Sequence, residues 1–492
     1  MTIESQQESR LARLKVPLGL LLGPLLAGLL LMLGAPEGLS EPAWRVVALT
    51  AWMAVWWVLE PVPIAVTALL PLVLLPLLEV APIEDVAAPY ANPLIFLFLG
   101  GFLLAEAIQR WGLHRRIAML VLRVAGRRPD HLVAGFMAAT AALSMWVSNT
   151  ATAALMVPIG LSVLEMLKQR GGEGGSHHMA LTLLLGIALG ANIGGMGTLI
   201  GTPPNALLAG FMADSYGIQI GFAQWMAVAL PPALLLLALA WWLLTRWIYP
   251  VGRSELPGVA AMLEEQARDL GRMTRPEQRV AAIFALVALA WVFRPLLEAW
   301  LEVPLSDAGI AVTAAVLLFV VPARWRQRQF LMDWDAAANL PWGVLIMVGG
   351  GLSLGTAIES SGLAAAVAEG LAVFGSWPTW GLVAMVALVV MAMSHMTSNT
   401  ATAAAILPLT ASLTVSLGHS PLLLSVPVAM AASCAFMLPV ATPPNAVVFA
   451  SGQLSVAEMV RAGALVSLAA LVVIVAVVFA LAMPLLGFGW AA

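Results

Sequence analysis

Long apolar runs recur along the whole chain, and polar residues gather in the shorter segments between them. Several of these runs reach 18 residues or more, which is long enough for an α-helix to cross the hydrocarbon core of a membrane. The pattern predicts an all-α polytopic membrane protein with about 11 transmembrane helices. We expect the spans near residues 16–34, 44–59, 62–80, 92–110, 179–213, 224–249, 278–296, 307–322, 341–359, 421–452 and 458–488.

Two further apolar stretches are too long for one straight span, and each carries the triplet Ser-Asn-Thr in its middle. The first has no charged residue between 131 and 165. As one helix it would be roughly 50 Å long, against about 30 Å of hydrocarbon. We therefore predict two re-entrant hairpins of half-helices, at 132–168 and 379–417. Their tips are expected at the triplets, 148–150 and 398–400.

The two halves of the chain repeat each other. The fragment "IAVTA" occurs at 64–68 and at 310–314, and "GGFLLAEAIQRWGL" from Gly100 corresponds to "GGLSLGTAIESSGL" from Gly350. The Ser-Asn-Thr triplets recur at the same offset of 250 residues. An odd number of predicted spans separates the hairpins, so the hairpins must enter from opposite faces. An inverted repeat with broken helices is the architecture of secondary transporters.

Each half also contains a helix that must be interrupted, at 179–213 and at 421–452, because "TPPN" lies within it. The prolines at 203–204 and 443–444 lack the N–H groups that a continuous helix needs. Each break leaves carbonyl groups free on one side and helix N-terminal N–H groups on the other. Carbonyl, hydroxyl and amide oxygens suit a small cation such as Na⁺, and helix N-termini suit an anion. A single motif would be more typical of helix packing, but the duplication favours a site that holds an anion with its cations.

Charge along the chain divides it into four parts and orients it. They are a cytoplasmic tail, a first half, a cytoplasmic connector and an inverted second half, at residues 1–15, 16–250, 251–277 and 278–492. Basic loops of membrane proteins favour the cytoplasm, which places the tail, the connector and the arginines at 110–128 and 323–329 inside. The stretch 110–128 alternates basic and apolar residues at helical spacing, so we expect it to lie along the membrane surface.

Composition narrows the classes of function. The chain is 61% hydrophobic and 10% charged, which excludes an ordinary soluble globule. The single Cys434 excludes an intrachain disulfide and a cysteine metal cluster, and the net charge of −3 argues against nucleic acid as a partner. The sequence has no phosphate-binding loop for a primary pump, and no HExxH motif or nucleophile–base pair for an enzyme. A channel would not need two hairpins that close the path from opposite sides.

The paired Ser-Asn-Thr tips and paired "TPPN" breaks, in the order hairpin then broken helix, resemble the divalent anion:sodium symporter (DASS) family. That family carries dicarboxylates, citrate and sulfate, and the resemblance spans residues 45–460. It implies two sodium sites, formed by Ser144, Ser148, Asn149 and Gly201 and by Ser394, Ser398, Asn399 and Ala441. It implies a substrate site formed by Ser148, Asn149, Thr150, Thr202, Pro203, Ser398, Asn399, Thr400, Thr442 and Pro443.

The resemblance also implies what the protein does. The expected function is secondary active transport of small divalent anions, above all the C4-dicarboxylates succinate, malate and fumarate, coupled to sodium. The co-transported ion is sodium, without an organic cofactor, and a homodimer working by an elevator mechanism is implied. We expect the chain in the bilayer of an inner (plasma) membrane, with a cytoplasmic N-terminus. Two alternatives stay open: a dicarboxylate exchanger without sodium coupling, and a sulfate or citrate carrier of the same fold.

Histidines near the motifs raise a further question. The first tip reads "SMWVSNT" and the second "SHMTSNT", which places His395 beside the implied second sodium site. A histidine deep in an apolar segment is costly, and two interpretations stay open. The ring is either a neutral imidazole bonded to a carbonyl of the opposing half-hairpin, or a modulator that adds pH dependence or replaces a cation. His177 and His178, in the Gly-rich linker 168–178, are expected to be solvated loop residues.

Overall fold

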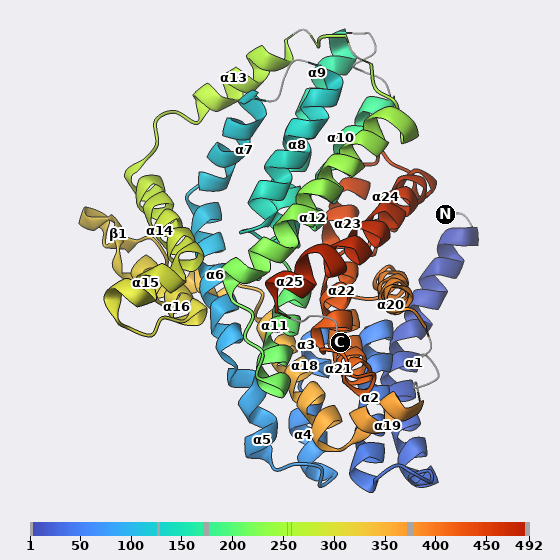
Figure 1. Ribbon diagram of the computed structural model, residues 1–492. Helices are drawn as coiled ribbons and strands as arrows, with labels where there is room; N and C mark the ends of the chain where they lie inside the picture. The colour runs from blue at the N-terminus through green and yellow to red at the C-terminus, as the bar shows by residue number, and fades with distance from the viewer. Residues whose placement is uncertain are drawn as a thin grey trace.

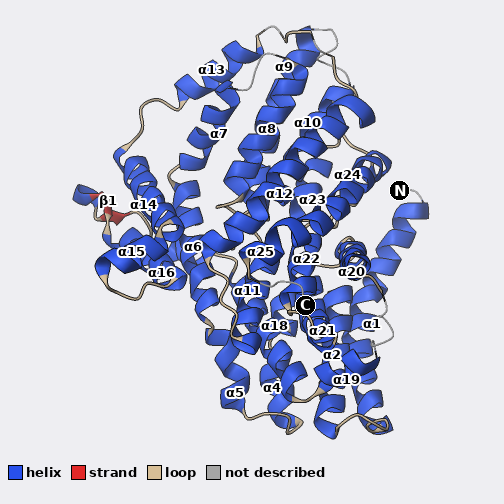
Figure 2. Ribbon diagram, in the orientation of Figure 1, coloured by secondary structure: helices blue, strands red, loops and turns tan. Residues whose placement is uncertain are grey.

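The computed structural model describes residues 3–124, 128–170, 177–252, 254–256, 258–370 and 377–487. Helices make up nearly all of this described part, as Figures 1 and 2 show, and its sheet is a two-stranded antiparallel ribbon. The expected all-α class is therefore confirmed. Of the predicted linker 168–178, residues 171–176 lie outside the described residues.

The first half is a succession of helices. They are α1 (Ile3–Leu33), α2 (Glu41–Leu59), α3 (Ile64–Thr67), α4 (Leu70–Leu77), α5 (Ile83–Ala87), the 3₁₀ helix η1 (Ala88–Ala91), α6 (Pro93–Arg110), α7 (Leu113–Val124), α8 (Pro129–Ser144), α9 (Asn149–Arg170), α10 (His177–Gly195), α11 (Pro203–Tyr216), α12 (Phe222–Trp242) and the π-helix η3 (Leu243–Ile248). The first helix begins at Ile3, inside the predicted tail. The predicted span 62–80 is divided between α3 and α4, because Pro71 in the first turn of α4 cannot donate a hydrogen bond to a preceding turn.

The connector and the second half follow. They contain α13 (Val259–Asp269), α14 (Arg275–Val292), α15 (Arg294–Leu301), α16 (Asp307–Val320), β1 (Pro322–Arg324), the 3₁₀ helix η4 (Trp325–Gln327), β2 (Gln329–Phe330), α17 (Trp334–Ala338), α18 (Trp342–Ser360), α19 (Leu363–Gly370), α20 (Thr379–Ser394), α21 (Asn399–Ser416), α22 (Leu422–Ala432), α23 (Pro443–Phe449), α24 (Val456–Val477), the π-helix η6 (Val478–Ala482) and α25 (Met483–Leu485). The predicted span 278–296 ends at Val292 and turns by 85° into α15, where Pro295 starts a new helix. The arginine-rich loop 323–329 is part of the β1–β2 ribbon.

Among the described residues, seven helices are long and apolar enough to cross a membrane, or eight if the bent pair α14–α15 counts as one span. Shorter apolar helices of 10–17 residues accompany them. Several of these shorter helices fall where prolines divide a predicted span or where a hairpin was predicted. The apolar helices agree with a polytopic membrane protein, whereas the number of about 11 spans stays a prediction.

Each predicted hairpin segment consists of two helices that flank a short tip. Helices α8 and α9 flank residues 145–148, and helices α20 and α21 flank residues 395–398. The Ser-Asn-Thr triplet is therefore the start of the second helix in each pair, rather than the middle of a loop. Figure 1 shows α8 and α9 in the upper half of the molecule and α21 in the lower half. Because α9 alone is long enough to cross a membrane, the re-entrant path stays a prediction.

Each half supplies a glycine-containing helix that packs on the "IAVTA" fragment of the other half. A Cβ atom on Gly100 of α6 would overlap with the carbonyl group of Ala311 in α16. A Cβ atom on Gly350 of α18 would overlap with the carbonyl group of Ala68, directly after α3. Small residues permit this close approach of helices in membrane proteins. The two halves are thus interlocked by the fragments that they repeat.

Asp130, a buried acid at the start of α8, links the first hairpin segment to α12 and η3. Asp130 in the first turn of α8 is 1% exposed, and its Oδ2 lies 2.8 Å from Nη2 of Arg246 and 3.0 Å from Nη2 of Arg128. The Asp130 carbonyl group also accepts the indole N–H of Trp241 at 2.8 Å. Removing one partner from a buried ion pair typically costs about 3–5 kcal/mol. The start of α8 is therefore firmly tied to the end of α12 and to η3.

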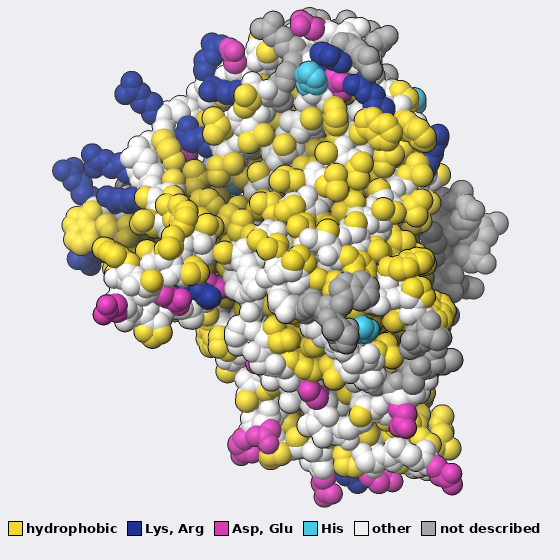
Figure 3. All heavy atoms as spheres, viewed as in Figure 1, with side chains coloured by type: hydrophobic (Ala, Val, Ile, Leu, Met, Phe, Trp, Pro, Cys, Tyr) yellow, Lys and Arg dark blue, Asp and Glu magenta, His cyan; other side chains and the backbone are white. Residues whose placement is uncertain are grey.

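Charged side chains lie mostly at the two ends of the molecule, with a hydrophobic belt between them. Figure 3 shows most Lys and Arg in the upper half of the molecule, with some Asp and Glu among them, and mostly Asp and Glu at the lower end. The lower end carries α4 and α5, around which the sequence places Glu79, Glu84 and Asp85. This separation supports the predicted orientation, in which the arginine-rich segments share the cytoplasmic side.

We expect Gly100→Ala and Gly350→Ala to lower the midpoint temperature of thermal unfolding of the detergent-solubilised protein. The added methyl groups meet backbone atoms, and overpacking of this kind typically costs about 1–3 kcal/mol. Gly28→Ala in α1 is the matched control, because a Cβ atom there has no atom within 4 Å. Equal midpoints for all three variants would contradict the interlocked packing.

Candidate functional site

The two tips and the two Pro-Pro breaks meet at one cavity of about 920 Å³. All of the residues implied to hold the substrate line it: Ser148, Asn149, Thr150, Thr202, Pro203, Ser398, Asn399, Thr400, Thr442 and Pro443. Of the residues implied to hold sodium, Gly201 and Ala441 also line the cavity. Ser144 and Ser394 are buried behind the tips, at the last residues of α8 and α20. The fold thus brings both halves of the predicted site together.

Four helices begin at this cavity. Ser148 precedes α9, Ser398 precedes α21, and Thr202 and Thr442 are the N-caps of α11 and α23. The first N–H groups of a helix have no partner within the helix and give its N-terminus a partial positive charge. The effect is largest for α9, α11 and α21, because α23 has only 7 residues. Helix starts that share a cavity favour an anion within it.

Behind the first tip, three oxygen atoms from different segments converge. Ser144 Oγ lies 2.5 Å from Asn149 Oδ1 and 2.8 Å from the carbonyl oxygen of Ala191. A serine hydroxyl carries one hydrogen, so it can donate to only one of these two acceptors. A cation held between the three oxygen atoms would attract the lone pairs of all of them. Hydroxyl, amide and carbonyl oxygens are the ligands of hard cations. These three atoms, which we call the first oxygen set, therefore fit Na⁺.

The second tip repeats the arrangement. Ser394 Oγ lies 2.7 Å from Asn399 Oδ1 and 2.6 Å from the carbonyl oxygen of Ala432. Two equivalent oxygen sets, one for each half, agree with two cation positions beside one anion.

Glycines lie close to the first oxygen set. A Cβ atom on Gly195 would lie 2.7 Å from Asn149 Oδ1, and a Cβ atom on Gly201 would overlap with the Gly195 carbonyl group. Ala435 and Ala441 stand at the corresponding positions of the second half. The first oxygen set therefore depends on close backbone approach, which glycine alone permits.

The asparagine of each "TPPN" fragment donates hydrogen bonds to carbonyl groups of the interrupted helix. Asn205 Nδ2 donates to the carbonyl group of Thr198 at 2.7 Å. Asn445 Nδ2 donates to the carbonyl groups of Leu438 at 2.9 Å and Ala435 at 3.2 Å. Buried carbonyl groups outside a helix need such partners. The sequence analysis gave these asparagines no role, although their repetition within "TPPN" was a signal for one.

Another buried asparagine links the two halves. Asn192 on α10 lines the cavity, and its Nδ2 donates to Thr442 Oγ1 at 3.1 Å and to Asn445 Oδ1 at 3.2 Å. A helix of the first half is thereby joined to the break of the second half. The sequence analysis missed this residue. The available signal was a single amide in an otherwise apolar segment, where a polar side chain is costly without a partner.

Two carboxylates face the cavity that favours an anion. Glu60 at the end of α2 and Glu106 on α6 line it, together with Gln109. Arg110, one turn after Glu106, pairs with Asp333 instead. Like charges repel, so this wall opposes an anion that the helix starts attract. Sequence reasoning missed both carboxylates, because their approach to the tips depends on how distant helices pack.

His395 lies beside the second tip, behind the residues that line the cavity. It is buried, and its Nδ1 lies 2.6 Å from the carbonyl oxygen of Met391. That partner is one turn earlier in the same helix, α20, so the expected bond to the opposing half-hairpin is wrong. Nε2 of the ring is buried and has no hydrogen-bond partner within the described part of the chain. The role of His395 as a modulator stays a prediction.

The two linker histidines are exposed, as expected, but they begin helix α10 rather than lie in a loop. His177 Nε2 lies 2.6 Å from Glu458 Oε1 on α24. His178 Nδ1 lies 3.2 Å from the carbonyl oxygen of Pro250. These partners are far away in the sequence, so no local pattern could have indicated them.

A helical chain whose paired breaks enclose a cavity suited to an anion and its cations has the architecture of a secondary membrane transporter. Residues 18–488 match the family model described as the sodium:sulfate symporter transmembrane region. The chain belongs to this family, the divalent anion:sodium symporters that its motifs resemble.

Relatives and solved structures agree with this assignment. A sodium-dependent dicarboxylate transporter SdcS from Staphylococcus saprophyticus is 41% identical, over 99% of this chain and 95% of the relative. SdcS from Staphylococcus aureus USA300 is 42% identical, over 94% of this chain and 90% of the relative. Two solved structures, each 13% identical, share the fold. The Alcanivorax borkumensis YdaH transporter has a TM-score of 0.53 over 91% of this chain and 100% of its own. Neisseria gonorrhoeae MtrF, from a class of antimetabolite efflux pumps, has a TM-score of 0.59 over 95% and 99%.

We expect Gly195→Ala to raise the Na⁺ concentration that stabilises the purified protein half-maximally against heat. The new methyl group would displace the Asn149 amide and open the first oxygen set. Gly381→Ala in α20 is the control, because its Cβ atom would make an ordinary contact at 3.4 Å with Pro378. An unchanged Na⁺ dependence of Gly195→Ala would contradict the cation assignment at the first tip.

Proposed function

We propose that this protein carries a small divalent anion across the membrane together with Na⁺. The observation that supports this most is the shared cavity, which gathers helix starts that favour an anion and, beside them, two oxygen sets that favour cations. Opposite charges held side by side stabilise each other. The family description and the names of the staphylococcal relatives support sodium as the cation and dicarboxylates as the anions.

The proposed roles follow from position. The anion is held by the helix starts and side chains of the two tips and breaks. One Na⁺ is carried at Ser144, Ser148, Asn149 and Gly201, and a second at Ser394, Ser398, Asn399 and Ala441. Asn149 and Asn399 belong to both kinds of site, since each is the first residue of a helix that starts at the cavity. A cation that fixes the asparagine amide therefore also orders the helix start that binds the anion.

The arrangement of the half-sites favours a substrate with a negative group at each end. One half-site comes from the first tip and break, and the other comes from the second, on the same cavity. Succinate, malate and fumarate carry two carboxylates separated by a short carbon chain. We therefore place the C4-dicarboxylates first among the substrates.

Membrane orientation, assembly and motion belong to the same proposal. The separation of basic and acidic side chains in Figure 3 supports an inner (plasma) membrane protein with a cytoplasmic N-terminus. In that orientation Glu60 and Asn339, which line the cavity, flank cytoplasmic loops, so the cavity opens to the cytoplasm. A homodimer, in which the part carrying both hairpins moves against a fixed scaffold as an elevator, completes the proposal.

Two related functions would use the same cavity. A dicarboxylate exchanger needs the helix starts but no net movement of cations. A sulfate or citrate carrier needs a dianion site, since hydroxyl groups and helix N-termini do not themselves encode the length of the substrate. The oxygen sets at Ser144 and Ser394 favour sodium coupling over exchange.

We expect proteoliposomes to accumulate radiolabelled succinate when Na⁺ is outside and not when choline replaces it. Asn149→Ala and Asn399→Ala should each abolish uptake, because each removes an oxygen of a cation set and disturbs a helix start. Ser162→Ala, on the exposed face of α9, is the matched control and should transport normally.

The other outcomes separate the alternatives. Uptake that needs internal dicarboxylate and ignores Na⁺ would make this protein an exchanger. Absence of succinate uptake, with uptake of sulfate or citrate in its place, would make it a carrier of those anions. Normal uptake by the two asparagine variants would refute the proposed site.

We expect Glu106→Gln to lower the KM for succinate several-fold and to strengthen inhibition by the citrate trianion even more. The carboxylate repels anions in proportion to their charge, so its loss helps a trianion most. Gln109→Glu adds a charge to the same wall and should shift both values in the opposite direction. If the two variants change KM in the same direction, the wall does not act through its charge.

A further inference from the structure

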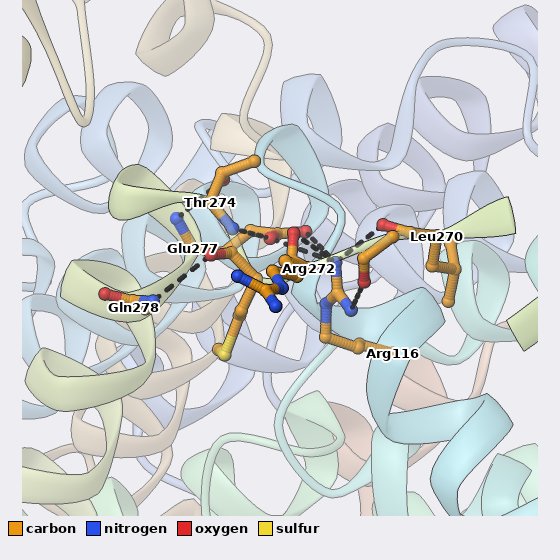
Figure 4. Close-up of polar contacts among 8 residues, drawn as sticks. Arg116, Leu270, Arg272, Thr274, Glu277 and Gln278 are labelled. Atoms are coloured by element: carbon orange, nitrogen blue, oxygen red, sulfur yellow. Dashed lines mark hydrogen bonds and ion pairs between the residues drawn. The ribbon is translucent and has the colours of Figure 1, made fainter. Parts of the chain in front are cut away.

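Helix α7 is fixed against the connector by one arginine. Arg116 Nη1 donates to the carbonyl group of Gly271 at 2.8 Å, and Nη2 donates to that of Leu270 at 2.9 Å. Arg116 Nη2 also lies 3.2 Å from Glu277 Oε2, and Figure 4 shows the guanidinium among these oxygens. Carbonyl groups at the end of a helix lack partners, and an arginine there satisfies them and interacts favourably with the helix dipole. Helices α7 and α13 are thereby held side by side.

The same network includes the start of α14. Glu277 accepts the backbone N–H of Thr274 at 2.6 Å, in the capping box that begins this helix. The Glu277 side chain is 10% exposed, so its bonds are largely shielded from water. The bonds of Arg116 and Glu277 thus hold helices α7, α13 and α14 together on the basic side of the molecule. A groove between braced helices is preformed, which lowers the entropy cost of binding a ligand there.

Two adjoining cavities lie between α7 and α13. One measures about 310 Å³ and is lined by Leu113, Arg116, Ile117, Met119, Leu120, Arg123, Ala267, Leu270 and Met273. The other measures about 290 Å³ and is lined by Leu122, Arg123, Val259, Ala260, Leu263, Glu264 and Arg268. Arg123 belongs to both linings. The two cavities therefore meet at Arg123 and form one groove, whose floor is mostly apolar in the larger cavity and partly charged in the smaller one.

Charge pairing leaves Arg123 as the uncompensated cation of this groove. Arg116 is paired with Glu277, and Arg268 lies 3.1 Å from Glu264. Within the described residues, no acidic side chain forms a salt bridge with Arg123, and its side chain is exposed. A guanidinium binds a phosphate group with two parallel hydrogen bonds. The groove is thus complementary to one phosphate.

Exposed apolar side chains lie on α7, with Leu120 in the lining of the groove and Val124 one turn beyond it. Leu120 and Val124 are 68% and 82% exposed, and they lie one helical turn apart beside Arg123. Exposed apolar and basic residues on one helix are typical of a helix that lies in the membrane interface. The exposed residues of α13 are mostly charged, as expected of a helix on the water side. This distribution is the one expected of a groove at the depth of the lipid headgroups.

We propose that the groove between α7 and α13 binds one anionic phospholipid, with its phosphate at Arg123 and its acyl chains along Leu120 and Val124. Basic pockets on the cytoplasmic side of membrane proteins bind anionic headgroups by the same chemistry. A lipid fits better than a free anion, because the apolar side chains of the groove and of α7 have no role in binding a small ion. The proposal is independent of the transported substrate.

The test is native mass spectrometry of the delipidated, detergent-solubilised protein, titrated with dioleoylphosphatidylglycerol or dioleoylphosphatidylcholine. We expect tighter binding of the anionic lipid. Arg123→Gln should weaken that binding about fivefold, which is the contribution of one arginine near a lipid surface, and should leave phosphatidylcholine binding unchanged. Arg123→Lys should retain most of the affinity.

Arg326→Gln is the matched control, since Arg326 is an exposed arginine of the β1–β2 ribbon outside the groove. It should bind phosphatidylglycerol as the wild type does. Equal binding of the two lipids, or equal affinities of Arg123→Gln and the wild type, would overturn the proposal. So would displacement of phosphatidylglycerol by an equal concentration of inorganic phosphate, because the groove would then be a site for a small anion.

Discussion

A chain in hydrocarbon cannot leave backbone polar groups without hydrogen-bond partners. This chain interrupts its helices at two tips and two breaks, and side chains satisfy most of the groups that are freed. Asn205 and Asn445 bind carbonyl groups of the breaks, and Thr198 Oγ1 donates to the Met145 carbonyl group at the first tip. The helix N-termini at the tips and breaks face one cavity. Their partial positive charges are therefore gathered where an anion can bind.

In the proposed function, the cation sites and the anion site share residues. Asn149 and Asn399 each begin a helix at the cavity and point their amide oxygen back to a serine at the end of the preceding helix. Filling the oxygen set with a cation would fix the amide and with it the helix start. Coupling is then the free energy by which a bound cation strengthens binding of the anion. By thermodynamic linkage, a bound anion strengthens binding of the cation by the same factor. Glu60 and Glu106 on the facing wall oppose this attraction, which would help release of the anion.

The sequence predicted those features that depend on local pattern and repetition. Apolar runs indicated the helices, and the duplicated "SNT" and "TPPN" fragments indicated the tips and breaks that line the cavity. Features that depend on contacts between distant segments escaped it. The approach of Glu106 to the tips and the pair of His177 with Glu458 leave no trace in any one stretch of sequence. For Asn192 the sequence shows a lone amide in an apolar helix, but it does not show that the partner is Thr442. The bend after Val292 escaped as well, because the predicted span 278–296 ran across Arg294 and Pro295, where the second helix begins.

The most direct test of the shared cavity is isothermal titration calorimetry of the purified protein with succinate, in sodium chloride and in choline chloride. We expect binding in sodium chloride and none in choline chloride. Combined Ser144→Ala and Ser394→Ala substitutions should abolish binding in sodium chloride as well. Equal succinate affinity in the two salts would show that the oxygen sets take no part in holding the anion, and would contradict the account.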